Sequence, residues 1–340
     1  MKLNTAIVGL GPHGKRLLKT ALEKENLKVV ALVDQNHATF SELELNGIST
    51  YLDTASLFSD HKVDFYIITT NGPSHYTLAK EAIKNGVKRI MVSKPLACTL
   101  QEAKEMVKLA EENNVRLAVD HGLRYDKTYN WLKEKIMSGK WGVLRSVYVM
   151  RNGIGLGCLG IHSFDLVNFL ADSPVKTVVG WVDKPIRENP RGKQFIDPGG
   201  LVVLNYENGV RGIISQIEDG AGPMSVEINL TRGRIRVNEK FREIDIVTKD
   251  PEKTGKPGKP VPYEKIEIPK EIQVRHDIFE LMKGILDELA GETSLKCDAR
   301  DGQNSLEILV AAYLSSERGN IPVELPLIAE VELNKFLPIT

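Results

Sequence analysis

The chain has 340 residues, enough for two domains or one large one. Apolar residues make up 42% of it, which allows a buried core and argues against a disordered chain. Lysine plus arginine and aspartate plus glutamate each number 45, so the zero net charge gives no support for a nucleic-acid partner. Three widely spaced cysteines do not make a disulfide framework, and no apolar run approaches about eighteen residues. We expect a cytoplasmic protein without a membrane span.

The first 120 residues alternate between short β runs and helical stretches. The predicted strands are 5–10, 28–34, 63–70, 87–93 and 115–121, and the predicted helices between them are 12–25, 76–86 and 99–114. Alternation of this kind is typical of a parallel sheet with helices on both faces.

The pattern changes after residue 123. We predict helices over 127–138, 157–171, 273–291 and 299–317, and strands over 144–151, 199–207, 210–218, 224–230 and 233–238. Short turns such as Asn208-Gly209 between strands indicate antiparallel pairing. The Lys-, Pro- and Gly-rich composition of segment 249–265 predicts an exposed loop. The expected architecture is a doubly wound α/β Rossmann domain (1–122) and an α+β domain (123–340) with a large open, mainly antiparallel sheet.

Three glycines separate the first strand from the first helix, in the spacing Gly9-x-Gly11-x-x-Gly14. In a dinucleotide-binding loop the first glycine makes the turn, the second lets the pyrophosphate approach, and the third lets the helix pack on the strand. Pro12 suits the first helical turn but has no N–H, so His13 and Gly14 supply the donors. A strand-to-helix turn that binds nothing is the plain alternative.

Asp34 ends the second predicted strand, about 20 residues after Gly14, where an acid reaches a ribose hydroxyl. Its charge would repel a 2′-phosphate. Gln35 and Asn36 follow it rather than an arginine. The sequence therefore favours NAD over NADP.

Lys94 lies just past the carboxyl end of a predicted strand, where doubly wound sheets bind ligands. The next residue is Pro95, and an X-Pro bond in a tight turn can be cis. A lysine near a nicotinamide and a substrate hydroxyl can relay that hydroxyl's proton. A solvated surface lysine is the alternative.

Seven short segments together resemble one family. In chain order they read GLGPHG, TTNGPSH, SKPLA, DHGLRY, WGVLRSVYV, GCLGIHSFDL and YENGVRG. They resemble the glucose–fructose oxidoreductase / inositol dehydrogenase (Gfo/Idh/MocA) family over nearly the whole chain. The resemblance implies oxidation or reduction of a sugar, polyol or nucleotide sugar with NAD or NADP. It also implies dimers or tetramers formed through the outer face of the C-terminal sheet.

The resemblance extends to individual positions. Lys94 takes the place of the family's catalytic lysine, and Ser93 replaces the glutamate before it. The implied cofactor-binding residues are Gly9, Gly11, Pro12, His13, Gly14, Asp34, Gln35, Thr70, Asn71, His75, Ser93 and Lys94. Arg124, Tyr125 and Cys158 are candidate substrate contacts.

The predicted helix 157–171 is apolar almost all round, which indicates burial. Cys158, His162 and Asp165 are spaced to share one face of it. The family has Asp-x-x-x-His-x-x-Asp here, with the histidine as acid/base, so the resemblance implies catalytic roles for His162 and Asp165. Cys158 replaces the first aspartate, and a thiol is a weak acceptor. A satisfied core histidine is the alternative.

Two other ligand classes were considered. Cys158 and His162 could hold zinc from one helix face, but neither other cysteine lies in a local ligand motif, so we expect no metal. In segment 184–200, Arg187, Arg191 and Lys193 could meet a diphosphate or carboxylate, or form a solvated loop.

The leading functional hypothesis is an NAD-dependent sugar or nucleotide-sugar dehydrogenase. One alternative is a dinucleotide-bound sensor without turnover, which the Cys158 substitution keeps open. The other is an enzyme that uses tightly bound NAD for transient oxidation. The expected assembly is a homodimer or homotetramer.

Overall fold

The computed structural model describes residues 2–239, 243–249, 263–273 and 277–339. These residues form two compact units. The first takes in the described parts of 1–125, 277–306 and 333–340, and the second those of 126–276 and 307–332. The division into domains at residue 122 stays a prediction.

A parallel sheet forms the centre of the first unit, as the alternating pattern predicted. Among the described residues its strand order is β3-β2-β1-β4-β5-β6, and every neighbouring pair is parallel. The strands are β1 (Leu3–Val8), β2 (Leu27–Val33), β3 (Ser49–Tyr51), β4 (Phe65–Ile68), β5 (Arg89–Val92) and β6 (Arg116–Val119). The order reverses between β1 and β4, and such switch points are where open α/β sheets bind ligands.

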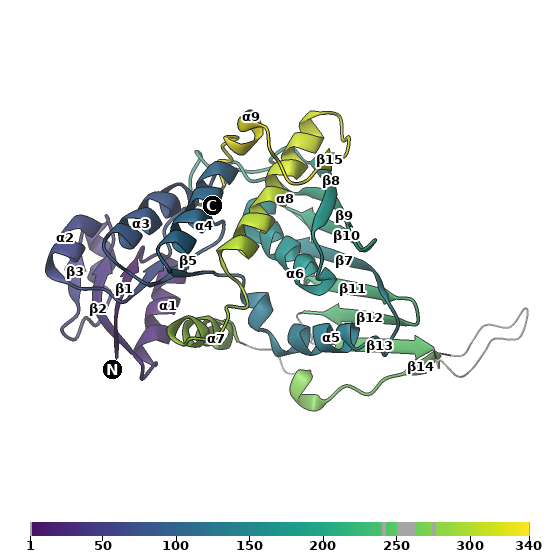
Figure 1. Ribbon diagram of the computed structural model, residues 1–340, viewed down its shortest axis with the longest axis horizontal. Helices are drawn as coiled ribbons and strands as arrows, with labels where there is room; N and C mark the ends of the chain where they lie inside the picture. Colours follow the sequence, from purple (N-terminus) through teal and green to yellow (C-terminus); the bar gives the residue numbers. More distant parts are fainter. Residues whose placement is uncertain (1, 240–242, 250–262, 274–276, 340) are drawn as a thin grey trace, which may run out of the picture. The chain divides into compact units, whose positions relative to one another are not determined.

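Helices from both ends of the chain pack on this sheet (Figure 1). They are α1 (Pro12–Leu22), α2 (Thr54–Asp60), α3 (Gly72–Lys84), α4 (Leu100–Glu112) and α7 (Ile278–Ala290), with the short helices η1 (His37–Phe40) and η2 (Gly122–Tyr125). Although α7 comes late in the chain, Met282 and Ile285 share a core with Leu17 of α1. Burial of these apolar side chains holds α7 to the first unit.

The second unit contains a mixed sheet, which confirms the predicted open, mainly antiparallel architecture. Its strand order over the described residues is β14-β13-β12-β11-β7-β10-β9-β8-β15, and only the β7–β10 pair is parallel. The strands are β7 (Leu144–Asn152), β8 (Val175–Val182), β9 (Gly200–Tyr206), β10 (Arg211–Ile217), β11 (Ser225–Leu230), β12 (Gly233–Asn238), β13 (Glu243–Lys249), β14 (Tyr263–Lys265) and β15 (Val323–Glu324).

One face of this sheet is buried. Val147, Val149 and Ile214 point inward, and a Cβ at Gly212 would press against Val167 of α6. The remaining helical elements are α5 (Lys127–Met137), η3 (Gly155–Gly160), α6 (Ile161–Ala171), η4 (Lys270–Ile272), α8 (Ala299–Glu317) and α9 (Glu330–Leu333). The boundary between the two units falls inside α8.

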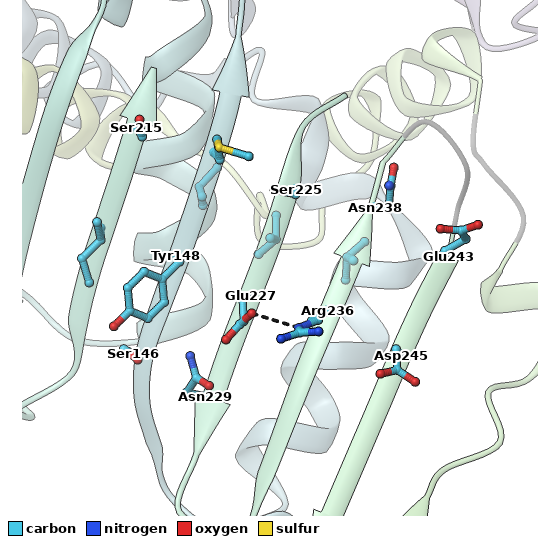
Figure 2. Close-up of a pocket in the computed structure, with 15 residues that line it drawn as sticks. Ser146, Tyr148, Ser215, Ser225, Glu227, Asn229, Arg236, Asn238, Glu243 and Asp245 are labelled. Carbon is cyan, nitrogen blue, oxygen red and sulfur yellow. Dashed lines mark hydrogen bonds and ion pairs between the residues drawn. The ribbon is translucent and has the colours of Figure 1, made fainter. Parts of the chain in front are cut away.

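The other face of the sheet is open (Figure 2). Tyr148 and Met150 on β7 are 45% and 47% exposed. They belong to a shallow cavity of about 910 Å³ that continues across β10, β11, β12 and β13. Glu227 and Arg236 form an ion pair on this face at 3.0 Å.

Most of the predicted exposed segment 249–265 lies outside the described residues. Its first residue belongs to β13 and its last three to β14.

Among the residues that are described, no helix is both long and apolar enough to cross a membrane.

Candidate dinucleotide site and catalytic helix

The loop between β1 and α1 leaves little room for side chains at two of its glycines. Gly9 has a φ of +90°, and a Cβ there would overlap the Thr70 backbone. A Cβ at Gly14 would overlap the Gly9 carbonyl oxygen, whereas one at Gly11 would meet nothing within 4 Å. The backbone is therefore close-packed where the turn is made and open where a pyrophosphate must approach. This arrangement fits a dinucleotide.

Asp34 follows β2 and contacts the glycine loop. Its Oδ2 accepts a hydrogen bond from the Leu10 N–H at 2.7 Å, and its Oδ1 accepts one from the Asn36 N–H at 2.9 Å. These bonds fix the carboxylate at the carboxyl end of β2. Each oxygen keeps acceptor capacity for a ribose hydroxyl.

His13, on the first turn of α1, pairs with an aspartate that follows β6. Its Nε2 lies 2.6 Å from Oδ2 of Asp120. Burial acts to raise the pKa of Asp120, but the His13 charge and hydrogen bond, together with the charges of His121 and Lys94, hold that pKa below its usual range. The sequence analysis did not single out Asp120, although it begins the DHGLRY segment.

Lys94 comes two residues after β5, and the Lys94–Pro95 bond is cis. The lysine is half-buried. Its charge contributes to lowering the pKa values of both Asp120 and His75. This position differs from that of a fully solvated surface lysine.

His75, on α3, joins two loops through backbone carbonyls. Its ring is fully buried; Nδ1 lies 2.7 Å from the Pro95 carbonyl oxygen and Nε2 lies 2.9 Å from that of Thr70. Burial, assisted by the Lys94 charge, lowers the pKa of His75 against the opposing effect of these hydrogen bonds. The ring thus positions the Thr70 and Pro95 loops, and direct contact with a cofactor stays a prediction.

Ser93 and its neighbours also bear on cofactor binding. Ser93 is 7% exposed, and its Oγ has no hydrogen-bond partner in the part of the chain that the structure describes. A buried hydroxyl without a partner at this sheet edge fits a polar ligand group such as a carboxamide. Asn71, at the N-terminus of α3, is exposed. The Thr70 hydroxyl accepts a hydrogen bond from Ser74 Oγ at 2.6 Å.

Arg124 and Tyr125 make contacts within the first unit. Arg124 donates to the Lys296 carbonyl oxygen at 2.7 Å and to Asp301 Oδ1 at 2.8 Å. The Tyr125 hydroxyl donates to Glu288 Oε2 at 2.5 Å, and its pKa is raised by burial and then by Glu288. Both residues hold later segments of the chain in place, and their role toward a substrate stays a prediction.

In the second unit, the segment predicted as one helix over 157–171 has two parts. Residues 155–160 form a π-helical turn, η3, and α6 begins at Ile161. Cys158 therefore lies in the π-helical turn rather than in an α-helix, whereas His162 and Asp165 both lie on α6. That the three side chains share one face stays a prediction. Gly155, with a φ of +61°, opens the π-helical turn, whose residues per turn exceed those of an α-helix.

Asp197 caps this turn and was missed by the sequence analysis. It is 5% exposed, and its two oxygens accept hydrogen bonds from the N–H groups of Gly157 (2.7 Å) and Cys158 (2.6 Å). The Pro198 carbonyl accepts a third, from the Leu156 N–H at 2.9 Å. These three bonds fix the backbone immediately before His162.

The candidate catalytic side chains of η3 and α6 differ in burial. Cys158 and His162 are half-buried, whereas Asp165 is fully buried. Burial, with the charge of Asp165, raises the pKa of Tyr206 well above its usual value. Arg151 at the end of β7 donates to the Leu159 carbonyl oxygen at 3.3 Å, beside Cys158.

Metal and anion binding find limited support. In the described residues no group of three or more His, Cys, Asp or Glu side chains is arranged to hold a metal. Arg187 binds Glu218, and Lys193 binds Glu188. Two of the three basic residues considered for a diphosphate therefore already have acidic partners.

Comparisons with known proteins agree with these features. The pattern described as "Oxidoreductase family, NAD-binding Rossmann fold" matches residues 3–121, and "Oxidoreductase family, C-terminal alpha/beta domain" matches 151–325. A D-apiose dehydrogenase from Paraburkholderia graminis is 26% identical over 92% of this chain and 88% of its own length. A myo-inositol 2-dehydrogenase from Thermotoga maritima is 24% identical over 73% of this chain and 78% of its own.

Solved structures show the same fold. The WlbA dehydrogenase from Bordetella pertussis, in complex with NADH and UDP-GlcNAcA, has a TM-score of 0.79 and 21% identity, covering 96% of this chain and 99% of its own. An oxidoreductase from Agrobacterium radiobacter, in complex with NAD+, L-tartaric acid and magnesium, has a TM-score of 0.78 and 21% identity, covering 95% and 98%. The chain belongs to the Gfo/Idh/MocA oxidoreductase family, which joins an NAD-binding Rossmann fold to a C-terminal α/β domain.

Proposed function

We propose that this protein is an NAD-dependent dehydrogenase that acts on a hydroxyl group of a carbohydrate, polyol or nucleotide sugar. The observation that carries the proposal is the pairing of the glycine loop and Asp34 with Lys94 at one carboxyl edge of the parallel sheet. Relatives named D-apiose dehydrogenase and myo-inositol 2-dehydrogenase support a sugar or polyol as substrate.

The glycine loop and Asp34 account for cofactor binding. Gly11 leaves space for the pyrophosphate, and the N–H groups of His13 and Gly14 are available as donors at the start of α1. Asp34, oriented by the Leu10 N–H, accepts from a ribose hydroxyl and disfavours a 2′-phosphate. These features support NAD over NADP.

Lys94 and His162 account for proton transfer in this proposal. Bound NAD supplies a hydride acceptor. Lys94 donates a hydrogen bond to the substrate hydroxyl oxygen, which makes its proton more acidic, and His162 takes that proton as general base. Asp165, one turn along α6, orients the imidazole or the substrate. The hydrogen bonds from Asp197 hold the backbone of the π-helical turn that precedes His162 in the chain.

Cys158 favours a second candidate, a dinucleotide-bound sensor without turnover. It stands where the family's first aspartate is expected, and a thiol is a poor proton acceptor. A third possibility within enzymes is transient oxidation with tightly held NAD.

Net formation of NADH distinguishes the three candidate functions, namely a dehydrogenase, a sensor and an enzyme that oxidises its substrate transiently. The purified protein is incubated with excess NAD⁺ and a panel of sugars, polyols and nucleotide sugars, and NADH absorbance is followed. The proposal expects many turnovers per protein molecule with at least one compound. Ligand binding without NADH formation supports a sensor, and substrate conversion without net NADH supports transient oxidation.

A further inference from the structure

A cavity of about 320 Å³ lies beside the capped turn in the second unit. Its walls come from residues 185–190, Lys193 and residues 195–197, from Ile154 just before η3, and from Glu218 just after β10. All of these residues belong to the second unit. The volume falls within the range of small-molecule sites.

Two polar atoms in the walls are buried and lack a hydrogen-bond partner among the described residues. They are Oε2 of Glu218, a residue that is 9% exposed, and Nδ2 of Asn189. The first is an acceptor and the second is a donor. Because unpaired buried polar groups are costly, the pair points to a ligand that both donates and accepts. A hydroxyl group does both.

The charge of the walls disfavours an anion. Arg187 donates to the Glu218 carbonyl oxygen at 2.8 Å and its Nε lies 3.3 Å from Glu218 Oε1, while Lys193 pairs with Glu188 at 3.1 Å. Asp197 adds a third carboxylate to these two cations and two anions. The walls therefore have a small excess of negative charge, which would repel a phosphate or carboxylate.

Apolar groups supply the rest of the surface. Ile154, Phe195 and Ile196 line the cavity, and they offer contacts for the C–H faces of a sugar ring. Asp197 lines the same cavity and caps the turn that contains Cys158. The cavity therefore adjoins the segment that leads into the catalytic helix.

We propose that this cavity is a subsite for an uncharged, hydroxyl-bearing portion of the substrate, with Glu218 accepting from a hydroxyl and Asn189 donating to one. The assignment of this ligand to the enzyme's substrate rests on the proposed dehydrogenase function. Binding in the cavity does not itself require turnover.

Isothermal titration calorimetry on the NAD-loaded full chain tests the proposal, with D-glucose and maltose as uncharged probes and D-glucuronate and D-glucose 6-phosphate as anionic ones. The uncharged probes should bind more tightly than the anionic ones. Glu218→Gln and Asn189→Ala should each weaken that binding about tenfold or more, the effect of losing a hydrogen bond to a charged or buried group. Lys184→Ala, exposed and outside the cavity, should bind like the unmodified protein.

Three results would overturn the subsite: tighter binding of the anionic probes, unchanged binding by both cavity variants, or no binding of either uncharged probe. Thermal unfolding shows whether each variant is folded, and Asn189→Ala, on a surface loop, covers the case in which Glu218→Gln is not. Binding of the uncharged probes with no NADH formation from any compound of the panel would support the subsite and refute the dehydrogenase. NADH formation with an unchanged KM in both Glu218→Gln and Asn189→Ala would support the dehydrogenase and refute the subsite.

Discussion

At the residue scale, Asp34 is the residue that we expect to set the choice between NAD and NADP. Its carboxylate accepts hydrogen bonds from the N–H groups of Leu10 and Asn36, and we propose that its charge disfavours the 2′-phosphate of NADP. Asp34→Ala should weaken NAD binding about tenfold or more, since hydrogen bonds to a charged group are lost. Asp34→Asn keeps an acceptor for the Leu10 N–H but removes the charge, so it should reduce the difference between the affinities for NAD and NADP. Calorimetry that finds NADP bound more tightly than NAD by the unmodified protein would refute this account.

Lys94 and His162 are the residues to which we assign proton transfer in the proposed mechanism. Lys94→Ala and His162→Ala should leave NAD affinity within a few-fold of the unmodified protein and lower turnover about 10²–10⁴-fold, the usual contribution of a general acid or base.

Matched controls exist for both residues. Lys84, at the end of α3, and His37, in η1, are exposed and outside the proposed machinery. Lys84→Ala and His37→Ala should turn over at the unmodified rate. Equal losses in the control and test variants would indicate that the effect is not specific to proton transfer.

The π-helical turn η3 and its cap show how one element depends on another. Asp197→Ala leaves the N–H groups of Gly157 and Cys158 without their acceptor, which should cost about 2–4 kcal/mol of unfolding free energy. Urea unfolding measures this loss of free energy, with the exposed Asp219→Ala as control.

Gly155 lies against the Asp197 carboxylate, which a Cβ at Gly155 would overlap. Gly155→Ala should therefore cost more unfolding free energy in the unmodified protein than it costs in the Asp197→Ala variant, where that carboxylate is absent. Additive effects in this double-mutant cycle would contradict the contact.

The elements that sequence analysis recovered are those with local signals. The strand–glycine–helix pattern around Gly9 gave β1 and α1, and Thr99 caps α4 by accepting from the Glu102 N–H at 3.1 Å. Residues 208–209 form the predicted hairpin turn between β9 and β10. Each of these signals lies within a few neighbouring residues.

Three of the features that were missed depend on distant partners. The π-helical turn is stabilised by Asp197, 40 residues beyond Gly157, and no local pattern shows that bond. Strand β8 was not predicted; it includes Gly180, where a Cβ would overlap the Ala312 backbone. Asp120 was not singled out, because its partner, His13, is 107 residues away in the chain and no local pattern shows the contact.

At the scale of the whole molecule, the open face of the sheet in the second unit favours self-association. The exposed Tyr148 and Met150 lie on a broad surface formed by five strands. Exposed apolar side chains of this kind favour a binding partner. A second copy of the chain can bury the same face of both subunits in a symmetric interface. We predict a dimer or tetramer in sedimentation velocity at micromolar concentration.

A double substitution on this face tests the prediction. Tyr148→Glu with Met150→Glu should weaken association at least about tenfold, because it places charges in a face that must lose water. Ile328→Glu changes a side chain that is 83% exposed and outside the cavity on this face, and should leave association unchanged. An unmodified protein that sediments as a monomer would refute the assembly.

Transfer of deuterium tests the central claim most directly. Polyols and sugars that bind the NAD-loaded protein are prepared with deuterium on their hydroxyl-bearing carbons, and mass spectrometry follows the label in the free nicotinamide pool. Our account predicts deuterated NADH in excess of the protein concentration, with Lys94→Ala and His162→Ala slowing its appearance. Ligand and NAD bound together with no label in the free NADH pool would contradict it.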